Sequence, residues 1–269
     1  PDRLPGGKAG GGQVMSKLFP PMYDTPETAQ SLGGLVCGSV SFFLLPLILT
    51  LFFFAENPPQ VYMGLEYLYQ GINFGLLFFV FRSYLRDSWL NVSIAPRKIL
   101  GVSLGAAVVI FGIYAFYVGA GYFGLIPQAN VIVLGAMPMT GVELMMVPGD
   151  LVILGGIPAM VFLTVLGPVI TVCMFYASVF APLCGSGKRF GAYAAMAVIL
   201  AIPRIITSFA VWGGWKELPL YLTQLPIHLL ACWTYQKTDT VWTPIFTLAI
   251  ANLLSCILLF VLQLVGIIA

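Results

Sequence analysis

Ionisable side chains inside long apolar segments are the residues of this chain that could do chemistry. Glu66, Arg204 and His228 each lie within an apolar run, and Glu143 and Asp150 lie in or beside a stretch broken by proline and glycine. A charge in an apolar environment is costly unless it is paired or hydrated. We therefore expect Glu66 and Arg204, at similar depth, to form an ion pair, and His228 to be a hydrogen-bonded packing residue. The alternative is a polar cavity, open to one face, into which Glu143 and Asp150 would also reach.

Peptide hydrolysis would need more than these groups supply. Attack by water requires a positioned general base or a metal, together with a group that stabilises the developing oxyanion. The chain has one histidine, and its five cysteines form no Cys-x-x-Cys pair. One histidine cannot build a multi-histidine metal site, and no phosphate-binding glycine loop or dinucleotide motif is recognisable. We therefore expect no catalytic residues, no metal and no cofactor.

The composition indicates the environment of these residues. Hydrophobic residues make up 59% of the chain and charged residues 8%, and the mean hydropathy is +0.97. Apolar runs near the roughly 20 residues that cross a bilayer recur along the chain. The pattern predicts an integral membrane protein, all-α, in which helices span the bilayer.

Apolar length, charge and proline divide the chain into segments. We expect a flexible cytoplasmic tail at 1–32 and a single transmembrane domain at 33–269. Residues 125–147 are interrupted by proline and glycine, and form either a re-entrant hairpin or an eighth short helix. Gly71 and Gly75 form a Gly-x-x-x-Gly pattern that favours helix packing. The remaining segments predict a bundle of about seven spans, at 33–55, 61–81, 98–119, 150–183, 190–211, 218–236 and 241–267.

Lysine and arginine predict the orientation. With alternating spans, ten of the twelve basic residues fall on one side, and only Lys216 and Arg204 do not. Because cytoplasmic loops carry the excess of positive charge, that side is expected to be cytoplasmic. The amino-terminal tail and the turns at 82–98, 184–189 and 237–240 would then share the cytoplasmic face of a plasma (inner) membrane.

The segment from Trp233 to Ile245, Trp-Thr-Tyr-Gln-Lys-Thr-Asp-Thr-Val-Trp-Thr-Pro-Ile, is followed by Leu248-Ala-Ile-Ala-Asn252. With the residues before it, from 165 to 256, it resembles the CAAX prenyl endopeptidase and bacteriocin-processing family of intramembrane peptidases. Members carry Glu-Glu-x-x-x-Arg, Phe-x-x-x-His and His-x-x-x-Asn motifs, and their glutamates and histidines activate water within the membrane. The resemblance implies the helical fold of that family.

At the motif positions this chain differs from the family. Thr171 and Val172 stand in place of the glutamate pair, and Tyr176 in place of the arginine. No histidine occurs at 200–205, where the second motif would lie. In the third motif Asn252 is retained and Leu248 replaces the histidine. A competing register places Leu65–Gly71, with its single glutamate, on the first motif, but it leaves more than a hundred residues before the next motif.

These residues predict a non-catalytic integral membrane protein of peptidase-like fold that acts as a scaffold, chaperone or regulatory subunit of a membrane complex. The expected partners are the lipid bilayer and another membrane protein, and nucleic acid is not expected. Two alternatives remain open. Prolines interrupt several spans, as in a small transporter or channel, and an active intramembrane peptidase could use Glu66 and His228.

Overall fold

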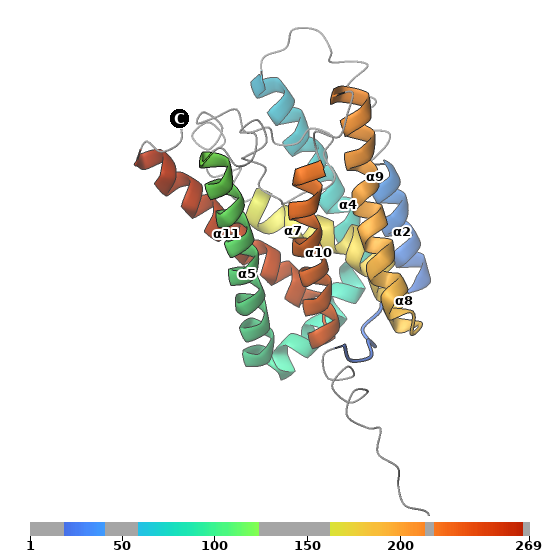
Figure 1. The fold of residues 1–269 in the computed structure, drawn as a ribbon. Helices are drawn as coiled ribbons and strands as arrows, with labels where there is room; N and C mark the ends of the chain where they lie inside the picture. The colour runs from blue at the N-terminus through green and yellow to red at the C-terminus, as the bar shows by residue number, and fades with distance from the viewer. Residues whose placement is uncertain (1–18, 41–58, 124–161, 213–217, 266–269) are drawn as a thin grey trace, which may run out of the picture.

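The computed structural model describes residues 19–40, 59–123, 162–212 and 218–265. Within these ranges every regular element is a helix, which confirms the all-α fold class. The helices lie side by side as an elongated bundle (Figure 1). In chain order they are α2 (Thr28–Ser39), α4 (Pro59–Ile94), α5 (Pro96–Tyr122), η3 (Phe162–Leu166), α7 (Gly167–Thr171), η4 (Val172–Phe180), α8 (Ala181–Gly185), α9 (Arg189–Trp212), α10 (Leu218–Thr238) and α11 (Trp242–Leu264).

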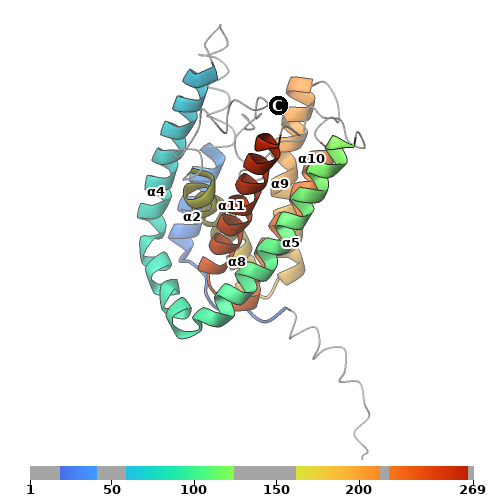
Figure 2. The same cartoon turned by 90° about the vertical axis from the view of Figure 1, so that its left-hand side faces the viewer.

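Each expected span that lies in the described ranges has a helix, but the end of the second span differs from the prediction. Residues 82–94, expected to be a turn, continue α4 as a helix, and the chain bends only at Ala95. Pro96 explains this end, since a proline disfavours helical geometry in the residue before it and suits the first turn of the next helix. The end of α4 curves beneath the bundle to reach α5 (Figure 2). The segment 125–147 lies outside the described residues.

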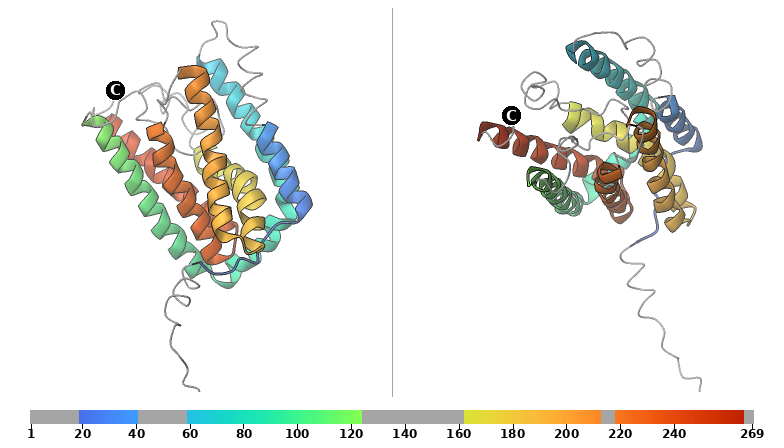
Figure 3. Two further views of the ribbon diagram at one scale, coloured as in Figure 1. Left: turned by 45° about the vertical axis from the view of Figure 1, so that its right-hand side comes forward. Right: turned by 45° about the horizontal axis from the view of Figure 1, so that its top comes forward.

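Of the tail expected at residues 1–32, the structure describes residues 19–32, and helix α2 starts within them. Helix α2 begins at Thr28, after a capping box in which Glu27 N donates to Gln30 Oε1 at 3.1 Å. Residues 19–27 run along the end of the bundle and contact it through hydrogen bonds, described below. A view from the side shows this segment passing beneath the helices (Figure 3).

Two helices of the described part are long and apolar enough to cross a membrane, Pro96–Phe116 and Thr164–Gly185. Large apolar side chains face outward along α5, among them Leu104, Val108 and Phe116. Exposed apolar surface of this extent marks contact with a membrane or with a partner protein. Polar side chains such as Asn73 and Ser103 are instead buried. This distribution fits a membrane protein.

The centre of the bundle is a helix of mixed geometry. In place of one uniform span to residue 183, the chain alternates between π-helical segments, η3 and η4, and the short α-helices α7 and α8. Within η4, Ser178 Oγ donates to the carbonyl of Cys173, five residues earlier, at 2.7 Å. Segment η4 packs against α2 and α9, and α7 packs against α11. Almost every side chain of η4 is buried, so this segment is the core element of the fold.

Helix α2 approaches η4 through glycines. A Cβ at Gly34 would overlap Ser178 Oγ, and one at Gly38 would meet Met174 at 3.5 Å. These two glycines form a Gly-x-x-x-Gly pair on the contacting face. The pair predicted at Gly71 and Gly75 does not make such a contact within the described residues, where a Cβ at either position meets nothing within 4 Å.

Candidate functional site

The interior polar pair consists of Tyr176 and His228. Tyr176 lies in η4 and His228 in α10, two residues after the in-helix Pro226. The phenol oxygen of Tyr176 lies 2.5 Å from His228 Nδ1, and the rings meet edge to face with centroids 6.1 Å apart. The side chains are 0% and 1% exposed. With the phenol donating, the neutral imidazole carries its proton on Nε2, so the pair joins η4 to α10 without burying a net charge.

Two further groups lie near this pair, one of them from a third helix. Tyr114 of α5 and Cys232 of α10 lie close enough to the Tyr176 phenol to interact with it electrostatically. Both residues are buried. The centre of the bundle thus brings together a phenol, an imidazole, a second phenol and a thiol from α5, η4 and α10.

The residues that the sequence places at the expected peptidase motif positions are also buried in the described part of the bundle. Thr171 and Val172 are 0% exposed, and Leu248 and Asn252 of α11 are less than a tenth exposed. Helices α7 and α11 pack together, so Thr171 and Leu248 belong to contacting elements. Of these residues only Thr171 and Asn252 carry polar side chains, and neither group is a general base at neutral pH.

The expected ion pair stays a prediction. Glu66 lies in α4 and Arg204 in α9, and the side chains of both are outside the described part of the structure. Glu143 and Asp150 lie wholly outside the described residues.

A second polar cluster lies at the end of the bundle where the amino-terminal segment enters. We call residues Phe19–Thr25 the strap. Asp239 Oδ1 accepts hydrogen bonds from the backbone N–H groups of Tyr23, at 2.8 Å, and Asp24, at 2.9 Å. Asp239 lies in the turn between α10 and α11 with φ 53°, a left-handed conformation that aspartate tolerates better than most residues. The turn therefore aims its carboxylate at the strap.

Asp24 connects the strap to three elements. Ser88 Oγ of α4 donates to Asp24 Oδ2 at 2.5 Å. The Asp24 carbonyl accepts from the hydroxyl of Tyr84 at 3.0 Å and from that of Tyr235 at 3.4 Å. The two tyrosine hydroxyls also contact each other. Strap, α4 and α10 are thus joined by a continuous chain of hydroxyl groups.

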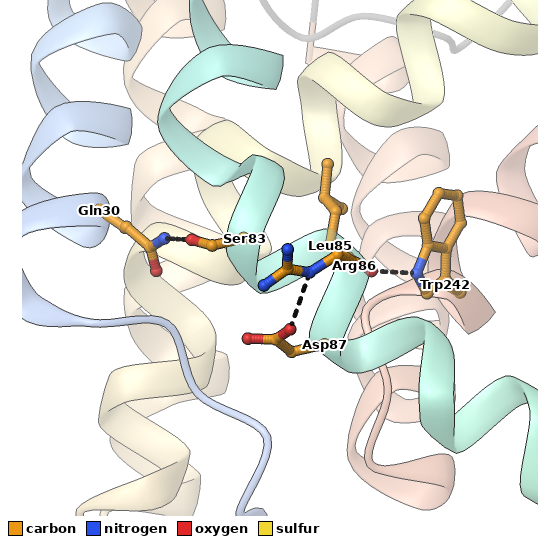
Figure 4. Close-up of polar contacts among 6 residues, drawn as sticks. All are labelled: Gln30, Ser83, Leu85, Arg86, Asp87 and Trp242. Atoms are coloured by element: carbon orange, nitrogen blue, oxygen red, sulfur yellow. Dashed lines mark hydrogen bonds and ion pairs between the residues drawn. The ribbon is translucent and has the colours of Figure 1, made fainter.

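Other residues hold the strap and the turn in place. Arg189 of α9 donates to the Phe19 carbonyl at 2.6 Å, and Gln236 Nε2 of α10 donates to the Pro20 carbonyl at 2.9 Å. Asn91 Nδ2 donates to the Asp239 carbonyl at 3.2 Å. Nearby, Gln30 Nε2 donates to Ser83 Oγ, Trp242 Nε1 donates to the Leu85 carbonyl, and Arg86 pairs with Asp87 on the surface (Figure 4).

The electrostatics of this cluster are dominated by Asp24. The pKa of its carboxyl is raised from 3.8 to about 6, chiefly by burial and in smaller part by the neighbouring charge of Asp239. The hydrogen bond from Ser88 opposes this effect. The cluster therefore holds a carboxyl group that titrates just below neutral pH.

The sequence did not identify this cluster, because it assigned Asp24 to a flexible tail and Asp239 to a turn. One feature of the sequence could have indicated the α10 residues and the turn residue of this cluster. The segment Trp233–Ile245, which drew attention in the sequence through its resemblance to a peptidase family, contributes Tyr235, Gln236 and Asp239 to the contacts with the strap.

Comparison with protein-family models, with curated proteins and with solved structures finds no match to this chain.

Proposed function

We propose that this chain is an integral membrane protein of peptidase-like fold that does not hydrolyse peptides and acts as a scaffold, chaperone or regulatory subunit of a membrane complex. The observation that carries the proposal is the chemistry of the interior at the motif positions. Thr171, Val172 and Leu248 are buried there. None of these side chains can take a proton from water at neutral pH. In the peptidase family that the sequence resembles, glutamate and histidine do so.

The polar groups that remain in the interior suit packing. Tyr176, at the position of the family's arginine, is hydrogen-bonded to His228. Both side chains are buried, and the bond between them crosses from η4 to α10. A buried hydrogen bond between two helices makes their association specific. We assign to it a structural role.

We also propose seven spans with the amino terminus in the cytoplasm of a plasma (inner) membrane. The start of α5, the turn between α8 and α9 and the last turn of α10 lie where the strap crosses the bundle (Figure 1). These segments carry Arg97, Lys98, Lys188, Arg189 and Lys237. A concentration of lysine and arginine at one end is what the positive-inside rule associates with the cytoplasmic face.

A cleavage assay tests the absence of hydrolysis. The protein is reconstituted in lipid nanodiscs and incubated with prenylated peptides and with leader peptides, and products are measured by mass spectrometry. A peptidase of the resembling family with intact glutamate and histidine motifs, reconstituted in the same way, is the positive control. We expect no product above that of empty nanodiscs. Cleavage that disappears in a Glu66→Gln, His228→Ala variant would overturn the proposal in favour of a peptidase.

The scaffold role is tested by the subunit composition of the complex that contains this chain. The protein is extracted from its native membrane in polymer-bounded nanodiscs, and the mass and subunit content of the particles are measured. We expect a second polypeptide in a fixed ratio to this chain. Particles that contain only this chain and lipid would contradict the assignment.

A small transporter or channel is the second candidate, and the π-helical geometry of η4 favours it. Segments of π-helix in membrane and soluble proteins often lie at functional sites, and η4 carries Tyr176 at the centre of the bundle. Flux of protons or small ions into proteoliposomes, reduced by Tyr176→Phe, would support this function. Flux equal to that of empty liposomes would count against it.

A further inference from the structure

The strap closes one end of the bundle by contacts to several elements at once. Its first residues are held by Arg189 of α9 and Gln236 of α10. Its last residues are held by Ser88 of α4 and by Asp239 of the α10–α11 turn. The aromatic ring of Phe19 also packs against Tyr193, with ring centroids 6.1 Å apart. Release of the strap would therefore remove contacts to α4, α9 and α10 at this end.

Two carboxylates meet where the strap is fastened. The backbone N–H of Asp24 donates to Asp239 Oδ1 at 2.9 Å, so the side chain of one acid binds the main chain of the other. The Asp24 carboxylate itself accepts from Ser88 Oγ at 2.5 Å. The charge of Asp239 disfavours ionisation of the Asp24 carboxyl, because like charges repel each other when both are ionised.

The groups that face Asp24 are hydroxyls and an acid. Helix α4 presents Tyr84 and Ser88, α10 presents Tyr235, and the turn presents Asp239. The basic residue Arg189 of α9 donates to the Phe19 carbonyl instead. Helix α10 also carries Lys237, half-buried, two residues before Asp239.

We propose that the strap is a proton-operated latch, which closes on α4, α9 and α10 when Asp24 is protonated and loosens when Asp24 and Asp239 are both charged. The latch does not depend on whether the chain hydrolyses peptides. It would make the bundle respond to acidification on the side of the membrane where the strap lies.

The direction of the pH response follows from the pKa of Asp24, which differs between the docked and the released strap. Burial raises the pKa of Asp24 to about 6 in the docked strap, against 3.8 in solvent. A group that binds its proton more tightly in the docked state stabilises docking fully below its solvent pKa. That stabilisation is lost as pH rises through the docked pKa. A difference of about two units corresponds to a roughly 100-fold fall in the docking constant between pH 4 and pH 8.

Pulsed EPR distances test the latch in the full chain. Spin labels are attached to Tyr23→Cys, an exposed strap position, and Arg86→Cys, an exposed position on α4, after replacement of the native cysteines. The labelled protein is measured in nanodiscs from pH 4 to pH 8. We expect a narrow distance distribution at pH 4 and a longer-distance population that grows as the pH rises toward 8.

Three variants make the test decisive. Asp24→Asn, which keeps an acceptor for Ser88 but carries no charge, is expected to stay closed at all pH values. Asp87→Asn, an exposed acid on α4, is the matched control and is expected to keep the pH response of the parent. Gln236→Ala removes the contact to Pro20 and weakens docking of the strap. If the parent strap is docked too tightly to open at any pH measured, this variant brings the released population into the range that EPR detects.

Two results would overturn the latch. One is a distance distribution independent of pH both in the parent and in the Gln236→Ala background. The other is an unchanged pH response in Asp24→Asn, which would assign the titration to a different group.

Discussion

At the scale of single residues, the buried hydrogen bond between Tyr176 and His228 is the contact that gives the polar interior a structural role. It joins a neutral phenol to a neutral imidazole, so no net charge is buried there. Breaking a buried hydrogen bond is costly because the remaining group has lost its water as well as its partner.

We predict that Tyr176→Phe lowers the free energy of unfolding by about 1–3 kcal/mol. The change deletes the hydroxyl that lies 2.5 Å from His228 Nδ1 and leaves the ring in place. Thermal unfolding in mild detergent measures the loss. Tyr23→Phe, at a side chain that is 77% exposed, is the matched control and should leave the melting temperature unchanged. Equal melting temperatures for both variants would show that the bond contributes nothing.

The turn residue Asp239 allows a second prediction at this scale. Its φ of 53° is tolerated by aspartate and asparagine but is strained for alanine. Its carboxylate also accepts two backbone N–H groups of the strap. We therefore expect Asp239→Ala to destabilise the protein by about 2 kcal/mol or more, and Asp239→Asn to cost less than half as much. Thermal unfolding of the two variants at one pH provides the comparison, and an equal loss in both would contradict the account.

At the scale of elements, the crossing of α2 over η4 depends on the absence of side chains. Gly34 faces Ser178 and Phe81, and Gly38 faces Met174 at ordinary contact distance. Gly75 of α4 meets nothing within 4 Å among the described residues. Three glycines in helices thus occupy three different environments.

We predict that alanine substitutions at these glycines rank in that order. Gly34→Ala should be the most damaging, by about 1–3 kcal/mol, because the new methyl group overlaps Ser178 Oγ and forces the helices apart. Gly38→Ala should be milder, since Met174 is flexible. Gly75→Ala should be neutral or stabilising because alanine favours the helix. Thermal unfolding of the three variants in one detergent ranks them, and a larger loss at Gly75 than at Gly34 would be inconsistent with the crossing.

The helices of this fold could be predicted from the sequence far better than their contacts. Apolar length and proline located α5, α9, α10 and α11, because burial in a bilayer demands long uninterrupted segments. The end of α4 at Ile94 was missed, since residues 82–94 carry charges that resemble a turn but also suit an exposed helix. Both glycine pairs have the same spacing, and one sequence does not reveal which helix face another helix covers.

The candidate site was predictable only in part, for a related reason. His228 stood out because it is the one histidine in an apolar segment. Its partner Tyr176 was singled out by resemblance, and the bond between them needed coordinates. Asp24 and Asp239 are 215 residues apart in the chain, and the hydrogen bond between them is set by the packing of the whole bundle. No local pattern encodes such a contact.

At the scale of the whole molecule, the described connections between helices lie at one end of the bundle. The strap, the bend at Ala95, the turn before Arg189 and the turn at Asp239 occupy the same end (Figure 1). Hydrogen bonds join these parts directly, as between Asn91 and Asp239 and between Arg189 and Phe19. This arrangement is expected of helices that cross a bilayer in alternation, with the basic residues left on the cytoplasmic side.

The topology leads to a prediction about accessibility. Single cysteines at Lys98, Lys188 and Lys237, introduced into a cysteine-free background, should all react with a membrane-impermeant maleimide from the cytoplasmic face, because all three positions belong to the strap end of the bundle. Lys216 falls on the other side in the seven-span arrangement, and a cysteine there is the matched probe for the opposite face. Labelling is measured in right-side-out and inside-out vesicles. If Lys98 and Lys237 reacted from opposite faces, the described bundle could not lie across the membrane in this way, and the seven-span arrangement would have to be abandoned.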